Sequence, residues 1–218
     1  MRKLVLKMSI SADGFVGGPN GEMDWLFRTM DKSALDWIEK TLWEAGVHIM
    51  GSRTFYDMAA YWPTSSESLA KPMNEIPKIV FSKKGFIEKT GDNLTTQALK
   101  DKTQFDLETG ISNGSSLKNN LTWTNAPVAT DLVGEITKLK QQEGKFVLAH
   151  GGASFAQDLV KYGVIDEYRL LIHPVILGKG LPLFAQAPKQ IDLKLESSTQ
   201  LSSGIIANIY STTRVTNS

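Results

Sequence analysis

Residues 145–155 read KFVLAHGGASF, an apolar run followed by two glycines and the start of a helical pattern. The run from Phe146 to Ala149 predicts a buried strand, and the segment from Ala153 to Tyr162 has the composition of a short helix. Two glycines at the junction allow the backbone to approach a ligand closely, and the free N–H groups of the first helical turn favour a phosphate. Packing of a helix on a strand explains a Gly-Gly turn equally well, so both interpretations stay open.

A second unit of the same kind lies earlier in the chain. Gly46 to Gly51 reads as a short strand and is followed by Ser52, Arg53 and Thr54 at the start of a helical pattern. Two hydroxyl groups and a guanidinium at a helix N-terminus suit an anion. The alternative is a hydroxyl N-cap beside a solvated arginine.

A third predicted strand, residues 77–81, ends in Ser82, Lys83 and Lys84. In dinucleotide-binding folds an acidic residue at this place accepts the ribose 2′-OH, whereas a hydroxyl and lysines favour a 2′-phosphate. If the chain binds a dinucleotide, these residue types therefore predict NADPH.

The first predicted strand, Leu4 to Ile10, runs into residues 11–21, which contain four glycines and a proline. Long loops that follow strands at the carboxyl edge of an α/β sheet often carry ligand sites, so we expect a lid here. A plain surface loop is the alternative. Residues 31–43 then show the apolar spacing of an amphipathic helix.

Composition narrows the class of protein. The chain has 218 residues, 41% of them hydrophobic, which is enough for the core of one domain spanning 1–218. A net charge of +1 argues against nucleic acid or an anionic membrane as partner and favours a small molecule. There is no cysteine, so thiol nucleophiles, thiolate metal sites and disulfides are excluded. No signal peptide and no apolar run near the roughly 18 residues of a membrane helix is evident, so we expect a cytoplasmic protein.

Residues 85–120 are polar and weakly periodic, which predicts an insertion on the surface. Gly110 to Gly114 within it matches the G-x-S-x-G pattern of hydrolases. That motif needs a hydrophobic strand before it and a helix after it, and neither is present, so a hydrolase is disfavoured.

The regular pattern resumes after the insertion. Residues 128–142 have helical spacing, and residues 164–177 are β-rich and broken by Pro174. Residues 191–195 and 204–215 predict closing antiparallel strands.

These units, in this order, resemble the dihydrofolate reductase fold. Within that fold the chain is similar to the reductase domain at the C-terminus of bacterial riboflavin-biosynthesis deaminase-reductase proteins, the RibD C-terminal domain family. The resemblance is carried by residues 11–16 (SADGFV), 23–25 (MDW), 50–55 (MGSRTF), 147–153 (VLAHGGA) and 165–180. It implies an α/β fold with a mostly parallel central sheet flanked by helices and with antiparallel C-terminal strands. The deaminase zinc signature cannot exist without cysteine, so the resemblance is to a stand-alone reductase-like domain.

The resemblance also implies that NADPH lies across the carboxyl ends of the strands. The two glycine turns would hold its phosphates, Arg53 with Ser82 and Lys83 would meet the 2′-phosphate, and the lid would cover the nicotinamide. The cofactor-binding residues implied in this way are Val16, Gly17, Gly51, Ser52, Arg53, Thr54, Ser82, Lys83, Gly151, Gly152, Ala153, Ser154 and Phe155.

For the substrate, the resemblance implies a carboxylate opposite the nicotinamide that orients a pteridine or pyrimidine and helps to supply a proton. Asp36 lies nearest to that position and is the predicted catalytic residue, although a solvated place on its helix is an open alternative. Asp13 and Asp24 are rivals, and Trp25 joins them as a predicted substrate contact. Asp13 beside Gly14 is equally typical of a turn.

The histidines predict no shared role. His48, between Val47 and Ile49, predicts a core position, His150 is expected to border the cofactor, and His173 is expected to belong to sheet pairing. Without a cluster of ligands at metal spacing, we predict no metal.

The function implied is an NADPH-dependent reductase of a flat heterocyclic or ribosylaminopyrimidine-type substrate, acting as a homodimer. The alternative is a non-catalytic module that binds or senses NADPH.

Overall fold

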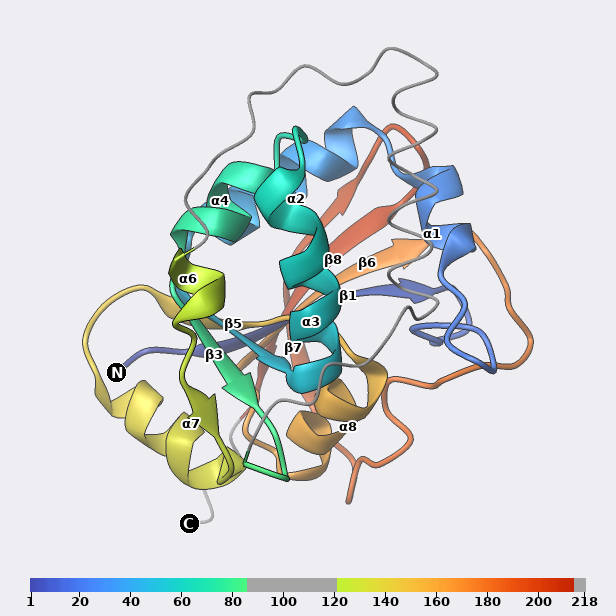
Figure 1. The fold of residues 1–218 in the computed structure, drawn as a ribbon. Coiled ribbons are helices and arrows are strands. Elements are labelled where there is room, and N and C mark those ends of the chain that lie inside the picture. Colours follow the sequence, from blue (N-terminus) through green and yellow to red (C-terminus); the bar gives the residue numbers. More distant parts are fainter. Residues whose placement is uncertain (86–120, 214–218) are drawn as a thin grey trace.

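The computed structural model of the protein describes residues 1–85 and 121–213 (Figure 1). Its strands form one eight-stranded sheet in the order β4-β3-β2-β5-β1-β6-β8-β7. The strands are β1 (Leu4–Ser11), β2 (Ala45–Gly51), β3 (Lys78–Phe81), β4 (Val128–Ala129), β5 (Phe146–Ala149), β6 (Glu167–His173), β7 (Leu193–Gln200) and β8 (Ile206–Thr212). All neighbours from β4 to β6 are parallel, and β8 and β7 are antiparallel. The sheet confirms the predicted fold class.

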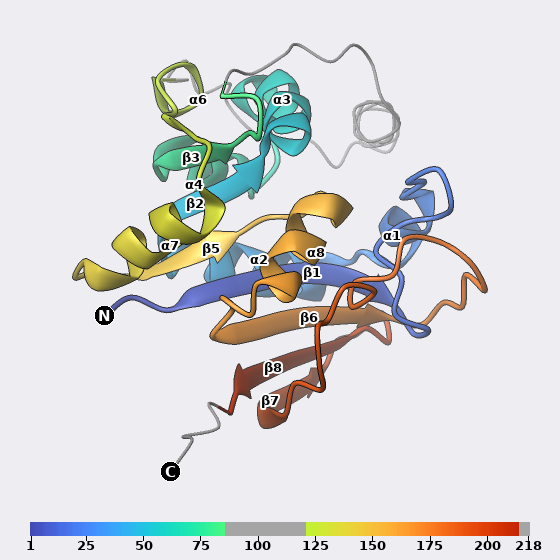
Figure 2. The same cartoon turned by 90° about the horizontal axis from the view of Figure 1, so that it is seen from below.

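Helices cover both faces of the parallel part of the sheet. They are α1 (Asp24–Thr29), α2 (Lys32–Trp43), α3 (Ser52–Tyr61), α4 (Ala70–Glu75), α6 (Leu121–Thr124), α7 (Leu132–Gln141) and α8 (Ala153–Lys161), with a 3-10 turn at Trp62–Thr64. Figure 2 shows β8 and β7 extending beyond the helices at one edge.

The alternation of side chains along β1 separates two hydrophobic clusters. Leu4 and Leu6 belong to the cluster that α7 and α8 cover, whereas Val5 belongs to the cluster beneath α2, α3 and α4. Most β1 side chains are buried on both faces, as is typical of a central parallel strand.

Strand β5 lies between β2 and β1 and is parallel to both. The carboxyl ends of β2, β3 and β5 therefore lie at one edge of the sheet. The turns that lead into α3 and α8 start from this edge, so the two glycine-containing units are neighbours in space although about a hundred residues separate them in the sequence.

The structure corrects two predicted boundaries after residue 120. Val128 lies in strand β4, and helix α7 begins only at Leu132, because the carboxylate of Asp131 caps it by accepting a hydrogen bond from Gly134 N–H at 3.0 Å. The predicted strand 164–177 is β6 and ends at His173, directly before Pro174. Apart from Gly85, the predicted insertion at 85–120, with its G-x-S-x-G match, lies outside the described residues.

Candidate functional site

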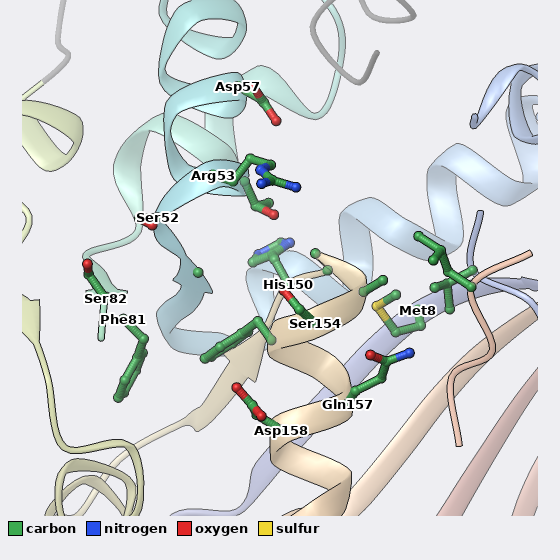
Figure 3. A pocket seen from close by; sticks show the side chains of 18 of the residues that line it. Met8, Ser52, Arg53, Asp57, Phe81, Ser82, His150, Ser154, Gln157 and Asp158 are labelled. Carbon is green, nitrogen blue, oxygen red and sulfur yellow. The ribbon is translucent and has the colours of Figure 1, made fainter. Parts of the chain in front are cut away.

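A cavity of about 1440 Å³ opens at the carboxyl ends of β1, β2, β3 and β5 (Figure 3). Small-molecule pockets usually measure roughly 300–1,000 Å³, so this cavity has room for more than one ligand. All the residues predicted to bind the cofactor line it, namely Val16, Gly17, Gly51, Ser52, Arg53, Thr54, Ser82, Lys83, Gly151, Gly152, Ala153, Ser154 and Phe155.

Two helices point uncapped N-termini at this cavity. The N-cap positions of α3 and α8 are Gly51 and Gly152, and no side chain of the described residues caps either helix. By contrast, α2 and α7 begin at Asp31 and Asp131, whose carboxylates accept hydrogen bonds from the first turn. The first N–H groups of α3 and α8 are therefore left without a side-chain acceptor, and the positive ends of both dipoles face the same space.

Glycine is required where the two turns meet. Gly152 has a φ of +97°, and a Cβ there would lie 2.5 Å from Thr54 Oγ1. A Cβ on Gly51 would lie 3.3 Å from the Cβ of Phe155. The first turns of α3 and α8 thus pack directly against each other, which brings both sets of free N–H groups together.

The residues predicted for the 2′-phosphate line the cavity from two elements. Ser82 and Lys83 follow β3, and Lys83 forms an ion pair with Asp158 of α8 at 3.0 Å while its own side chain is 86% exposed. Arg53 lies in the first turn of α3, and Figure 3 shows it near His150. Within the described part of the chain Arg53 has no ion pair.

The lining of the cavity includes a lysine that the sequence analysis missed. Lys7 lies on β1 and lines the cavity with Met8 and Ser9. Desolvation lowers the pKa of Lys7 to about 8. A cation placed within an otherwise apolar central strand is the sequence signal that could have found it, because buried charges are rare without a function or a partner.

His150 follows β5 and also lines the cavity. It is only 5% exposed, and burial, the largest cause, holds its pKa well below the usual value. Its ring meets the His48 ring edge to face at 4.5 Å, and its Nε2 has no hydrogen-bond partner among the residues that the structure describes. His48 is fully buried, and burial lowers its pKa to about 3, so both imidazoles are neutral at physiological pH. The positions of His48 in the core and of His150 at the cavity agree with the prediction.

His173, at the end of β6, is fully buried, and its Nδ1 shares a hydrogen bond of 2.6 Å with Thr29 Oγ1.

The structure does not bring the predicted substrate residues to the cavity. Asp36 pairs with Lys32 at 2.7 Å on the exposed side of α2. Asp24 is exposed and pairs with Arg28 at 3.3 Å. Trp25 is buried and does not line the cavity.

Asp13 connects two loops instead. It accepts hydrogen bonds from Ser11 Oγ at 2.6 Å and from Gly178 N–H at 2.7 Å, with Ser11 the largest cause of its lowered pKa. This geometry agrees with the turn interpretation. The buried carboxylate that does line the cavity is Asp57 of α3, which sequence reasoning did not identify.

Residues 1–85 and 121–213 contain no group of three potential metal-ligating side chains, and no helix among them is long and apolar enough to span a membrane.

The chain matches the sequence model of a known protein family over nearly its whole length. The sequence model of the RibD C-terminal domain matches residues 2–207. The uncharacterized protein YyaP of Bacillus subtilis (strain 168) is 28% identical over 210 residues, which cover 96% of this chain and 94% of YyaP.

Solved structures agree on the fold. A pyrimidine reductase-like protein from Corynebacterium diphtheriae aligns with a TM-score of 0.60 at 16% identity, over 98% of this chain and 92% of the other. A dihydrofolate reductase from Enterococcus faecalis complexed with NADP(H) aligns with a TM-score of 0.55 at 10% identity, over 97% of both chains. The fold is therefore that of dihydrofolate reductases.

Proposed function

The chain belongs to the RibD C-terminal domain family, and from that membership and the geometry of the cavity we propose that it is an NADPH-dependent reductase. The observation that carries the proposal is the pair of uncapped helix N-termini, α3 and α8, at one large cavity. Such paired N–H groups and dipoles suit a pyrophosphate. The dihydrofolate reductase of similar fold that was solved with NADP(H) supports the choice of cofactor.

The residues present fit the phosphates of a dinucleotide. The backbone N–H groups of Ser52 to Thr54 and of Ala153 to Phe155 would hold the pyrophosphate, since no side chain caps these turns. Ser82 and Lys83 would meet the 2′-phosphate. When bound, NADPH supplies a hydride.

The remaining lining of the cavity suits the substrate. Met23, Leu26 and Met58 give it apolar walls for a flat heterocycle, and Lys7 and Ser9 give it polar groups. Lys7 replaces Asp36 in the proposed mechanism, because Asp36 lies outside the cavity. An acceptor C=N or C=O group gains a proton when it is reduced, and a protonated Lys7 Nζ can donate that proton. A pKa of about 8 keeps most of this amine protonated at pH 7 and still able to release its proton.

Titration tests the proposal. NADPH is expected to quench the tryptophan fluorescence more strongly than NADH at equal concentration, and a panel of dihydropterins and ribosylaminopyrimidines should include a compound whose reduction oxidises NADPH. Binding without turnover of any member would favour the alternative, a non-catalytic NADPH-binding or sensing module. Failure of both nucleotides to bind would contradict both functions.

We also propose that the protein forms a homodimer. The edge strand β7 supports this, because all eight of its residues are exposed and Leu195 is 53% exposed. Sedimentation velocity tests it, and a monomer at micromolar concentration would contradict it.

A further inference from the structure

Lys7 lines the cavity and has no charged partner among the described residues. Lys7 lies on β1 in the wall of the cavity and is half-buried. Within the described part of the chain it makes no hydrogen bond and no ion pair. Lys7 differs in this from the buried Lys78, whose Nζ donates hydrogen bonds to Ile76 O at 2.7 Å and to Thr122 Oγ1 at 2.9 Å.

The strands on either side offer Lys7 no free carboxylate. On β6 its register partner is Arg169, which is held by Glu44 at 2.6 Å and by Glu167 at 2.8 Å. On β5, His150 lies one position beyond the last paired residue and stays neutral. His173 of β6 is bound to Thr29.

The helices that pack on this face of the sheet contribute one acidic side chain to the cavity. Helix α2 packs onto it through Ala34, Ile38 and Leu42, and α3 contributes Asp57 to the cavity. Burial is nevertheless the cause that sets the pKa of Lys7, at about 8, so about half of the amine is uncharged at pH 8.

We infer that Lys7 is a nucleophilic amine that forms an imine with small aldehydes carrying a phosphate or a carboxylate. An uncharged lysine in a ligand cavity is the usual requirement for this chemistry. The Nζ lone pair attacks the carbonyl carbon and a C–N bond forms. The carbonyl oxygen then leaves as water with the two hydrogens of the amine, so the step balances without an oxidant or a reductant. It does not require the proposed reductase activity.

Other groups in the cavity explain why the aldehyde should carry a phosphate or a carboxylate. Arg53 is exposed and without an ion pair among the described residues, and the uncapped starts of α3 and α8 line the same space. An aldehyde that carries an anion can therefore bind before the amine attacks it, which raises the local concentration at Lys7.

The experiment uses pyridoxal 5′-phosphate as the probe, on the whole chain without cofactor. After incubation at pH 8, borohydride fixes the imine and peptide mass mapping locates it. We expect at least tenfold more label on Lys7 than on the exposed Lys179, a half-maximal labelling rate near pH 8, and weaker labelling by pyridoxal, which lacks the phosphate. Lys7→Arg should abolish the main adduct, and Lys179→Arg should leave it unchanged.

Two results would overturn the inference. One is label spread evenly over surface lysines of the unmodified chain. The other is a labelling midpoint above about pH 10, the value of an ordinary lysine. Both are measured on the wild-type protein, so they stay informative if Lys7→Arg fails to fold. Equal labelling by pyridoxal would overturn the requirement for an anion. Loss of NADPH binding with intact labelling would contradict the proposed reductase and leave this inference standing.

Discussion

The hydroxyl of Thr54 occupies the place that a side chain on Gly152 would need, 2.5 Å from the position of a Cβ. This contact joins the first turn of α3 to the first turn of α8. Because both turns lie on the candidate phosphate site, the same contact fixes the distance between the two helix N-termini. Gly152 is therefore as much a packing residue as a binding residue.

Gly152→Ala should destabilise the protein by about 1–3 kcal/mol, since a φ of +97° and the Thr54 hydroxyl both oppose a Cβ. Thermal unfolding measures the change. Adding Thr54→Ala removes the clash and leaves the backbone strain, so the double variant should recover part of the loss. A single variant as stable as the wild type would contradict the packing of the two turns. Larger side chains at this position are poor probes of cofactor affinity for the same reason.

Lys83→Gln should weaken NADPH binding by about two- to fivefold, equivalent to about 0.5–1 kcal/mol, the usual contribution of an exposed ion pair. NADH lacks the 2′-phosphate, so its affinity should not change. Fluorescence titration with both nucleotides measures the difference, with Lys179→Gln as a control on an exposed lysine that does not line the cavity. An equal loss for both nucleotides would place Lys83 away from the 2′-phosphate.

Lys7→Met should lower turnover by at least about 100-fold, the scale of general acid catalysis, while NADPH still binds. In the wild type the proton donor is the ammonium form, which is present below pH 8 and lost as the pH rises through about 8. The rate should therefore fall on the alkaline side of that value. A pH profile of the single-turnover rate tests this, and a flat profile between pH 7 and pH 9 would exclude Lys7 as the donor.

Asp36→Asn should leave kcat/KM within about twofold, because the Asp36 carboxylate pairs with Lys32 on the surface and exposed pairs contribute little. Asp57→Asn, which alters the buried carboxylate at the cavity, is the matched comparison and should reduce kcat/KM more. Steady-state kinetics distinguishes them. A large loss in Asp36→Asn alone would restore the role that the family resemblance implied.

Lys78 should make stability depend on pH. Burial lowers its pKa to about 7, so between about pH 7 and pH 10.5 the unfolded chain binds more protons than the folded chain. This group contributes instability below pH 7 that is relieved as the pH rises, with a slope of at most about 1.4 kcal/mol per pH unit. Chemical denaturation of the wild type should show stability rising across this window, and Lys78→Met should flatten the rise. An unchanged slope in the variant would mean that the pKa of Lys78 is the same in the folded and the unfolded chain.

The strands and turns around the cavity were predictable because apolar runs ended by glycines are local signals. The family resemblance further identified the residues that line it. Asp36 was assigned by counting residues along its helix to the acidic position of the family. The separate helix α1, Asp24–Thr29, shifts this count, and no local sequence pattern shows the shift. Lys7 was missed because β1 is buried on both faces. Its apolar and polar side chains do not alternate, so the sequence does not indicate which of them line a cavity. Helix α7 was predicted too long because its helical spacing continues back through β4.

The position of β1 between β5 and β6 constrains how the chain can fold. Strand β1 has no strand partner until residues 146–173 have been synthesised, and the hydrogen bond from Leu4 N–H to the Asp166 carboxylate spans 162 residues. Contacts of such high order slow folding and leave an apolar segment unpaired on the nascent chain. The strand that carries Lys7 thus waits for both of its neighbours, β5 and β6, so the cavity forms only when the sheet closes around β1.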